Sequence, residues 1–198
     1  MKKAVSPVLR AAVILLVLTS VCTLLLAGGN LLYEGVKAGR QRTLRMAILG
    51  AFGGEFDDGS FDEAFRSLVT VEERPKDKAT LFLYQGTPRQ AALLVSGPGL
   101  WGVIEMLVFF DTDAIRITRV SVISQAETPG LGGRIEEEWF LNQFRSLSYA
   151  TPVRIVKQRT GDANEVDAIT GATNTSRSVE EIINRAAALV RKEEGAEK

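Results

Sequence analysis

An uncharged apolar segment near the N-terminus constrains most strongly what this chain can fold into. Residues 11–29 contain no charged side chain, and ten of these 19 residues are Val, Ile or Leu. Each of the ten favours membrane insertion by about 0.3 to 0.6 kcal/mol, and a helix needs about 20 residues to cross the hydrocarbon core. The sequence therefore predicts a basic N-terminus at residues 1–10 and a transmembrane helix at residues 11–29.

A cleaved signal peptide is the alternative interpretation of this segment. Lys2, Lys3 and Arg10 form a basic start, and residues 27–29 are small. The apolar run is long for a signal peptide and is followed by further apolar residues, which favours a retained anchor. Four basic residues between positions 37 and 45 follow the segment closely, so the charges on its two sides do not fix its orientation.

The composition excludes several classes of function. The chain has 24 basic and 24 acidic residues, which leaves no net charge to attract nucleic acid. It has no histidine and a single cysteine, Cys22, so it cannot build a zinc site, an iron–sulfur centre or an internal disulfide. We therefore predict no metal site, and any electron carrier must be an added organic cofactor.

The rest of the sequence predicts an α+β fold. Residues 30–50 predict a connecting helix interrupted by Gly35 and Gly39, and residues 61–69 a short amphipathic helix. Runs rich in β-branched and aromatic residues predict a mainly antiparallel sheet because the turns between them are short; the runs are 80–85, 91–96, 103–110, 115–124 and 153–158. A covering helix is expected over Glu136–Tyr149, with Trp139, Phe140 and Phe144 facing inward.

A carboxylate, a glycine and a row of hydroxyls precede the last predicted helix. The sequence from Asp167 to Ser176 reads Asp-Ala-Ile-Thr-Gly-Ala-Thr-Asn-Thr-Ser, and residues 179–190 then carry one apolar stripe at helical spacing. The helix is expected to start within Asn174–Ser178, where Ser178 and Glu181 have the spacing of a capping box. The start of a helix stabilises a phosphate even without basic side chains. In isolation, the same residues are equally consistent with a simple helix cap.

Two glycine-rich loops are further candidates for a binding site. Gly97-Pro98-Gly99-Leu100-Trp101-Gly102 lets the backbone approach a flat ligand, and Leu100 and Trp101 supply an apolar wall. Glu127-Thr128-Pro129-Gly130-Leu131-Gly132-Gly133 is the second loop, and its glycines lack the spacing of a dinucleotide-binding motif.

These residues carry a resemblance to a known family. Asp167–Thr173 matches the pattern Asp-x-x-(Ser/Thr)-Gly-Ala-Thr, and Glu127–Gly132 is similar to a Glu-Thr-Pro-Gly-Leu-Gly segment. Both are typical of the FMN-binding domain shared by the G subunit of the Rnf complex and the C subunit of the sodium-pumping NADH:quinone reductase. The resemblance extends in outline over the chain and implies an FMN-binding domain at residues 51–198.

The resemblance implies a role for each motif residue. Thr173 would carry FMN through a phosphoester, and a flavin transferase that recognises Asp167 would attach it. Thr170, Gly171, Ala172 and Asn174 would shape the phosphate and ribityl site. Glu127, Thr128 and Leu131 would border the ring, and Leu100 with Trp101 would close its other side. The chain would relay electrons without any nucleophile or general base of its own.

The resemblance also implies where the protein acts and with which partners. The chain would be a single-pass protein of a prokaryotic inner membrane, with its flavin domain outside the cytoplasm, in contact with membrane lipid and with other subunits of an ion-translocating complex. Its short length favours the Rnf G subunit, whereas the Gly97–Trp101 segment resembles the quinone reductase C subunit. A third hypothesis is an anchored binding or scaffold module without covalent flavin.

Overall fold

The computed structural model describes residues 7–54, 57 and 59–196, and the chain forms two compact units that divide after Gly50. The described part of the first unit is helix α1 (Pro7–Ala51) without its last residue. The α1 segment Arg10–Gly28 is by length and composition able to cross a membrane. Lys2 and Lys3, which the sequence places in the basic N-terminus, lie outside the described residues. The interruption expected at Gly35 and Gly39 is wrong, because one glycine costs a helix only about 1 kcal/mol relative to alanine.

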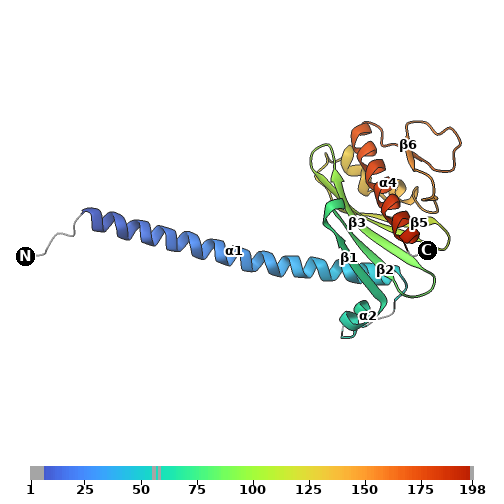
Figure 1. The fold of residues 1–198 in the computed structure, drawn as a ribbon. Coiled ribbons are helices and arrows are strands. Elements are labelled where there is room, and N and C mark those ends of the chain that lie inside the picture. Colours follow the sequence, from blue (N-terminus) through green and yellow to red (C-terminus); the bar gives the residue numbers. More distant parts are fainter. Residues whose placement is uncertain (1–6, 55–56, 58, 197–198) are drawn as a thin grey trace, which may run out of the picture. The chain divides into compact units, whose positions relative to one another are not determined.

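The second unit is built on a five-stranded antiparallel sheet in which each strand pairs with the next along the chain (Figure 1). Its strands are β1 (Val69–Arg74), β2 (Ala79–Tyr84), β3 (Gln90–Pro98), β4 (Val103–Asp111) and β5 (Arg116–Ser124). The register is continuous from Gln90↔Asp111 to Pro98↔Val103 between β3 and β4. The predicted α+β class and antiparallel sheet are confirmed, and β1 is the one strand of this sheet that the sequence pattern did not predict.

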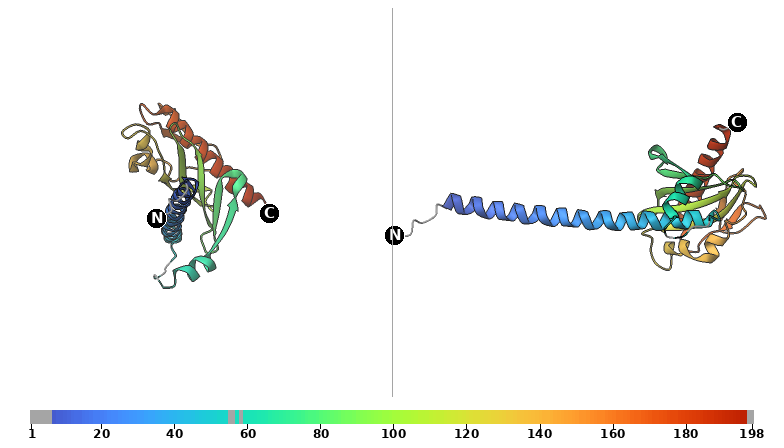
Figure 2. Two further views of the ribbon diagram at one scale, coloured as in Figure 1. Left: turned by 90° about the vertical axis from the view of Figure 1, so that its left-hand side faces the viewer. Right: turned by 90° about the horizontal axis from the view of Figure 1, so that it is seen from below.

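Helix α4 (Thr173–Ala196) packs along one face of this sheet, as Figures 1 and 2 show. Its stripe of buried residues, which includes Val179, Ile183 and Val190, joins a core with Leu93, Met106, Phe110 and other inward side chains of the sheet. The opposite face is covered by aromatic residues: the rings of Phe52 and Phe109 lie 5.9 Å apart, and those of Phe65 and Phe82 6.5 Å apart. Phe61 and Phe65 lie on helix α2 (Phe61–Leu68). Because both faces are covered, residues 106–110 of β4 are all buried.

The elements between β5 and α4 are short. They are the 3-10 helix η2 (Gly132–Glu136), helix α3 (Glu138–Asn142), and the strands β6 (Arg154–Val156) and β7 (Glu165–Asp167); a further 3-10 turn, η1 (Pro75–Asp77), joins β1 to β2. The strands β6 and β7 pair in parallel, with Val156 opposite Asp167. The sequence pattern missed β7 and its parallel pairing, because three residues are too few to show a period.

The single helix expected over Glu136–Tyr149 is wrong. Ser146 adopts a left-handed conformation (φ 67°), and its N–H donates to Ile117 O while Ile117 N–H donates to Leu147 O. This pairing with β5 replaces helical hydrogen bonds. Phe140 and Phe144 are buried as expected, but Trp139 is 42% exposed, because its indole N–H donates to Glu137 and its ring lies 5.3 Å from the Arg134 guanidinium carbon.

The packing of α4 predicts a large loss of stability when its stripe is truncated. Ile183 is fully buried in the core, so Ile183→Ala is expected to lower the free energy of unfolding by about 2 to 5 kcal/mol. Urea denaturation of the detergent-solubilised chain, followed by tryptophan fluorescence, measures this loss. The exposed Glu181→Ala on the same helix is the control, and equal stability of the two variants would contradict the described packing.

Candidate functional site

The motif Asp167–Thr173 lies between strand β7 and helix α4. Asp167 ends β7, and Ala168 N–H donates to Val156 O of the paired strand at 2.8 Å. Gly171 then turns the chain with φ +82°, and a Cβ at this position would lie 3.1 Å from Leu131 Cδ2. Glycine is therefore favoured by the positive φ, and a larger residue would also press against the Leu131 side chain.

Helix α4 begins at Thr173, one residue before the expected interval. Its first turn is closed by Ser176 N–H, which donates to Ala172 O at 2.9 Å, and the Ser176 hydroxyl accepts the Ile169 N–H at 3.2 Å. Ser176 thus ties the turn to the helix, and the capping box expected at Ser178 and Glu181 lies inside the helix instead of at its start.

The motif side chains divide into exposed and buried groups. Thr170, Thr173 and Asn174 are exposed, whereas Ala172 is 6% exposed and packs into the core. Thr173 therefore lies at the surface, at the first residue of α4. The following turns of α4 pack into the core.

Glu127 is the buried centre of the site. Its side chain accepts the Trp101 backbone N–H at 3.0 Å through Oε1 and the Thr175 hydroxyl at 2.6 Å through Oε2, and the residue is 5% exposed. It thereby joins the β3–β4 turn to the first turn of α4. The sequence singled out all three of these segments but gave no sign that this carboxylate connects them.

Glycines surround the Glu127 carboxylate closely. A Cβ on Gly132 would lie 2.7 Å from both Glu127 Oε2 and Thr175 Oγ1, and a Cβ on Gly99 would lie 2.5 Å from Glu127 Oε1. Any side chain at either position would displace the carboxylate or its partners. The glycines of the two loops therefore serve close packing around Glu127.

The predicted ring-bordering residues lie on these same loops. Leu100 is 53% exposed, Trp101 70% and Leu131 46%. Thr128 is exposed, and its backbone carbonyl accepts the N–H groups of Leu131 and Gly133, which shapes the turn. The structure thus brings three large apolar side chains onto loops that converge beside the start of α4.

Asp167 is held by two residues that the sequence did not single out. Its carboxylate accepts Arg159 Nε at 3.0 Å. The Gln143 side chain accepts the Asp167 N–H at 2.9 Å, donates to the Asp167 carbonyl at 3.4 Å, and also accepts from the Arg159 guanidinium. The backbone and the carboxylate of Asp167 are therefore both oriented.

The loop before β7 is organised by a second buried carboxylate. Glu165 is 1% exposed and accepts both the N–H and the hydroxyl of Thr160. The backbone N–H of Thr160 is the main cause that holds the pKa of Glu165 below its usual value; its hydroxyl and the charge of Arg154 act in the same direction, while burial opposes them.

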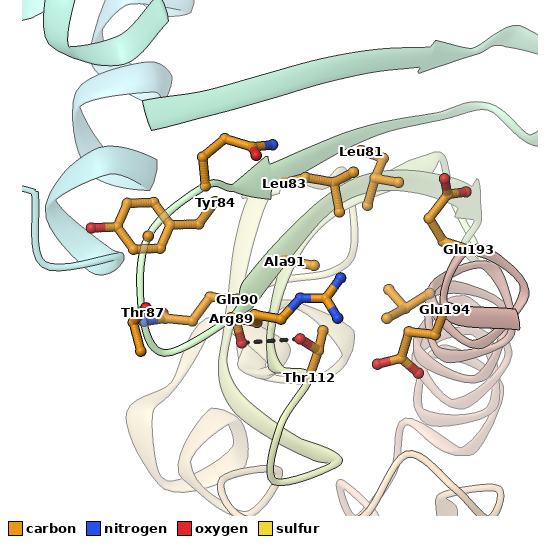
Figure 3. Close-up of a pocket in the computed structure, with 13 residues that line it drawn as sticks. Leu81, Leu83, Tyr84, Thr87, Arg89, Gln90, Ala91, Thr112, Glu193 and Glu194 are labelled. Carbon is orange, nitrogen blue, oxygen red and sulfur yellow. Dashed lines mark hydrogen bonds between the residues drawn. The ribbon is translucent and has the colours of Figure 1, made fainter. Parts of the chain in front are cut away.

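Two cavities lie at opposite ends of α4. One of about 270 Å³ is lined by Thr173 and its neighbours on α4 and by residues of β6. The other, of about 330 Å³ (Figure 3), is lined by residues of β2, the β2–β3 turn, β3 and the last turns of α4, including Arg89, Val190 and Glu194. The glutamates on its helical side already have partners, since Glu193 pairs with Arg74 and Glu194 accepts the Tyr149 hydroxyl.

The residues of the candidate site fall within a segment that matches a known protein family. Residues 99–188 match the model of the FMN-binding domain family, and they contain Trp101, Glu127 and Thr173. This match covers just under half of the chain. The family that the motifs resemble is therefore confirmed, and the match supports FMN as the expected cofactor.

Named relatives belong to two kinds of complex. The chain is 34% identical over 106 residues to the C subunit of the Na⁺-translocating NADH-quinone reductase of Yersinia pestis, covering 50% of this chain and 40% of the relative. It is 31% identical over 116 residues to the G subunit of the Na⁺-translocating ferredoxin:NAD⁺ oxidoreductase complex of Acetobacterium woodii, covering 57% and 55%. The chain thus matches about half the length of these relatives.

Two solved structures share the fold. The C subunit of the Na⁺-translocating NADH-quinone reductase from Parabacteroides distasonis is 22% identical, with a TM-score of 0.58 over 75% of this chain and 90% of that one. NqrC of Shewanella oneidensis is 21% identical, with a TM-score of 0.56 over 74% and 91%. At these identities the likeness establishes the fold of the FMN-binding domain alone.

The contacts of Glu127 predict the effect of removing its carboxylate. Glu127→Ala removes the acceptor of the part-buried Trp101 N–H and of the buried Thr175 hydroxyl, and it is expected to lower the free energy of unfolding by about 2 to 4 kcal/mol. Glu127→Gln keeps the shape and one acceptor oxygen, so a smaller loss is expected. Urea denaturation compares the two, and an alanine variant as stable as the glutamine variant would contradict the bridging role.

The lowered pKa of Glu165 predicts a dependence of stability on pH. A carboxyl group whose pKa is depressed on folding contributes stability above its unfolded pKa of about 4.3, and this contribution is lost as the pH falls through the folded value. Glu165→Gln should therefore be less stable than the wild type at pH 7, with a smaller difference at pH 3. Glu138→Gln, at an exposed position, is the control and should show no such convergence.

Proposed function

We propose that this chain is a membrane-anchored electron-transfer subunit that carries FMN covalently on Thr173, in an Rnf-type ferredoxin:NAD oxidoreductase complex. The observation that carries the proposal is the convergence of three segments on Glu127 beside an exposed threonine at the start of α4. The C subunit of a sodium-translocating NADH:quinone reductase is the alternative, and relatives of both kinds support the shared part of the proposal.

The residues present fit a covalently held FMN. Thr173 offers an exposed hydroxyl, and its place at the first residue of α4 favours a phosphate through the unpaired N–H groups there. Gly171 allows the turn before Thr173 with its positive φ, and it allows the close approach of Leu131. Leu100, Trp101 and Leu131 supply exposed apolar surface for a flat ring. When bound, FMN would supply the redox chemistry that no side chain of this composition can provide.

Each residue of the site would have a binding or positioning role. Thr173 would hold the phosphoester, with Thr170, Gly171, Ala172 and Asn174 around the phosphate and ribityl chain. Glu127 would fix the loops of Trp101 and Leu131 against α4, with Thr128 shaping the turn. Asp167 would present a carboxylate to a flavin transferase, oriented by Arg159 and Gln143. The transfer would join the Thr173 oxygen to the FMN phosphorus of FAD, break the pyrophosphate bond and release AMP.

The proposed placement in the cell is supported by α1 and by the resemblance. The segment Arg10–Gly28 would anchor the chain in the lipid of a prokaryotic inner membrane, with residues 1–10 as its basic N-terminus and residues 30–50 as the connection to a flavin domain at residues 51–198 on the extracytoplasmic side. Neighbouring subunits would exchange electrons with the FMN. A scaffold module that never carries flavin is the competing hypothesis.

Mass spectrometry separates these hypotheses. The full chain, coexpressed with an active flavin transferase and then denatured, is expected to carry the added mass of one FMN less one water, and Thr173→Ala is expected to carry none. Thr118→Ala, at an exposed position of β5, is the matched control and should be modified like the wild type. Asp167→Ala should reduce the modified fraction severalfold.

An unmodified wild type, with the transferase active on another substrate, would remove the basis of the proposal and favour the scaffold. Flavin that is lost on denaturation would instead indicate a noncovalent binder.

A further inference from the structure

The cavity beside Thr173 is formed by two elements that meet at the motif. Thr173, Ser176, Arg177 and Glu180 line it from α4. Strand β6, the following Lys157 and Ala168 line it from the other side. Thr173 and Arg177 are four residues apart on the helix and therefore share one face. The residue that the proposed function modifies is thus part of the lining of this cavity.

The charges around the cavity are mostly positive. Arg154, Lys157 and Arg177 line it with a single acidic side chain, Glu180, whose carboxylate accepts the Ile155 N–H. Arg154 lies 3.6 Å from the buried Glu165. Within the part of the chain that the structure describes, Lys157 and Arg177 form no ion pair, although the whole chain has no net charge. The positive charge is therefore local to the surface beside Thr173.

We infer that this cavity is an anion subsite in which Lys157 and Arg177 hold the phosphoryl group of the flavin nucleotide. The inference rests on the proposed function, because it takes Thr173 as the attachment residue. A phosphoryl group bonded to the Thr173 oxygen would be attached to a side chain that lines the same cavity as Lys157 and Arg177. Charge-assisted hydrogen bonds from Lys and Arg are the usual protein contacts of phosphoryl oxygens.

The sequence indicated only the start of the last helix as a phosphate site, and the subsite adds the side chains of Lys157 and Arg177. Arg177 lies on α4 and Lys157 directly follows β6, so the two approach the phosphoryl group from different elements. Each side chain is exposed, and an exposed charge contributes modestly. We therefore expect a measurable effect only when both are removed, and an effect that weakens with salt.

The inference is tested by comparing two flavins that differ only in the phosphate. The full chain, produced without a transferase and kept in detergent, is titrated into FMN and into riboflavin, and quenching of flavin fluorescence gives both affinities. The wild type is expected to bind FMN about tenfold more tightly than riboflavin. The double variant Lys157→Ala/Arg177→Ala is expected to reduce this preference to about twofold or less without weakening riboflavin binding.

A matched double variant controls for the loss of two positive charges. Arg66→Ala/Lys76→Ala removes two exposed cations that do not line the cavity, and it should keep the preference for FMN. Added salt should lower FMN affinity for the wild type more than for the cavity variant. If the double cavity variant keeps the full preference, or loses riboflavin affinity by the same factor, the inference is overturned.

Covalently modified protein supplies an independent readout where noncovalent binding is too weak to measure. The ³¹P resonance of the attached phosphodiester should shift in the double cavity variant and not in the control variant, and an unchanged resonance would overturn the inference. Intact mass separates this result from the proposed function. If FMN is attached to Thr173 but the double cavity variant keeps the preference for FMN and the ³¹P resonance of the wild type, only the subsite is disproved. If no FMN is attached but the double cavity variant loses the preference for FMN, the covalent attachment is disproved and the phosphate subsite remains supported.

Discussion

The carboxylate of Glu127 is the interaction on which the arrangement of the site depends. Its partners lie 26 and 48 residues away along the chain, at the Trp101 N–H and the Thr175 hydroxyl. A buried carboxylate is costly unless hydrogen bonds compensate its lost hydration, and here one oxygen accepts from each segment. Gly99 and Gly132 approach so closely that the carboxylate has little freedom to move. The β3–β4 turn and the loop that carries Glu127 are thereby fixed against the start of α4.

Helix α4 connects this site to the stability of the whole domain. Its buried stripe packs on β3 and β4, so the position of Thr173 is set by the same contacts that form the core. The parallel pair β6–β7 fixes the chain that enters the helix, and Ser176 closes the turn between them. A site on a rigid element is positioned more accurately than one on a free loop. The exposed Thr173 therefore begins a helix that the core of the domain holds in place.

The fold class and the main strands followed from the sequence, because β-branched runs and short turns are local signals. The family motifs similarly pointed to Thr173 and to the two glycine loops. The roles of Gln143 and Arg159 could not be predicted, since they reach Asp167 from 24 and 8 residues away through side-chain contacts that leave no periodic pattern. The same holds for Lys157 and Arg177, which share a cavity only because β6 packs beside α4. Trp139 was misassigned because an aromatic residue in an apolar run can instead lie over an arginine at the surface.

Covalent attachment and an open site are physically consistent with each other. A site that binds a small molecule by affinity alone usually buries about 70 to 90% of the ligand surface. Here Leu100, Trp101 and Leu131 are each close to half exposed or more. Under the proposed function a tether at Thr173 keeps the flavin at an effective concentration on the order of millimolar or higher, so deep burial is unnecessary. An exposed ring edge is what an electron relay needs, because a neighbouring carrier can then approach it without any rearrangement of the sheet, α4 or the loops that Glu127 holds together.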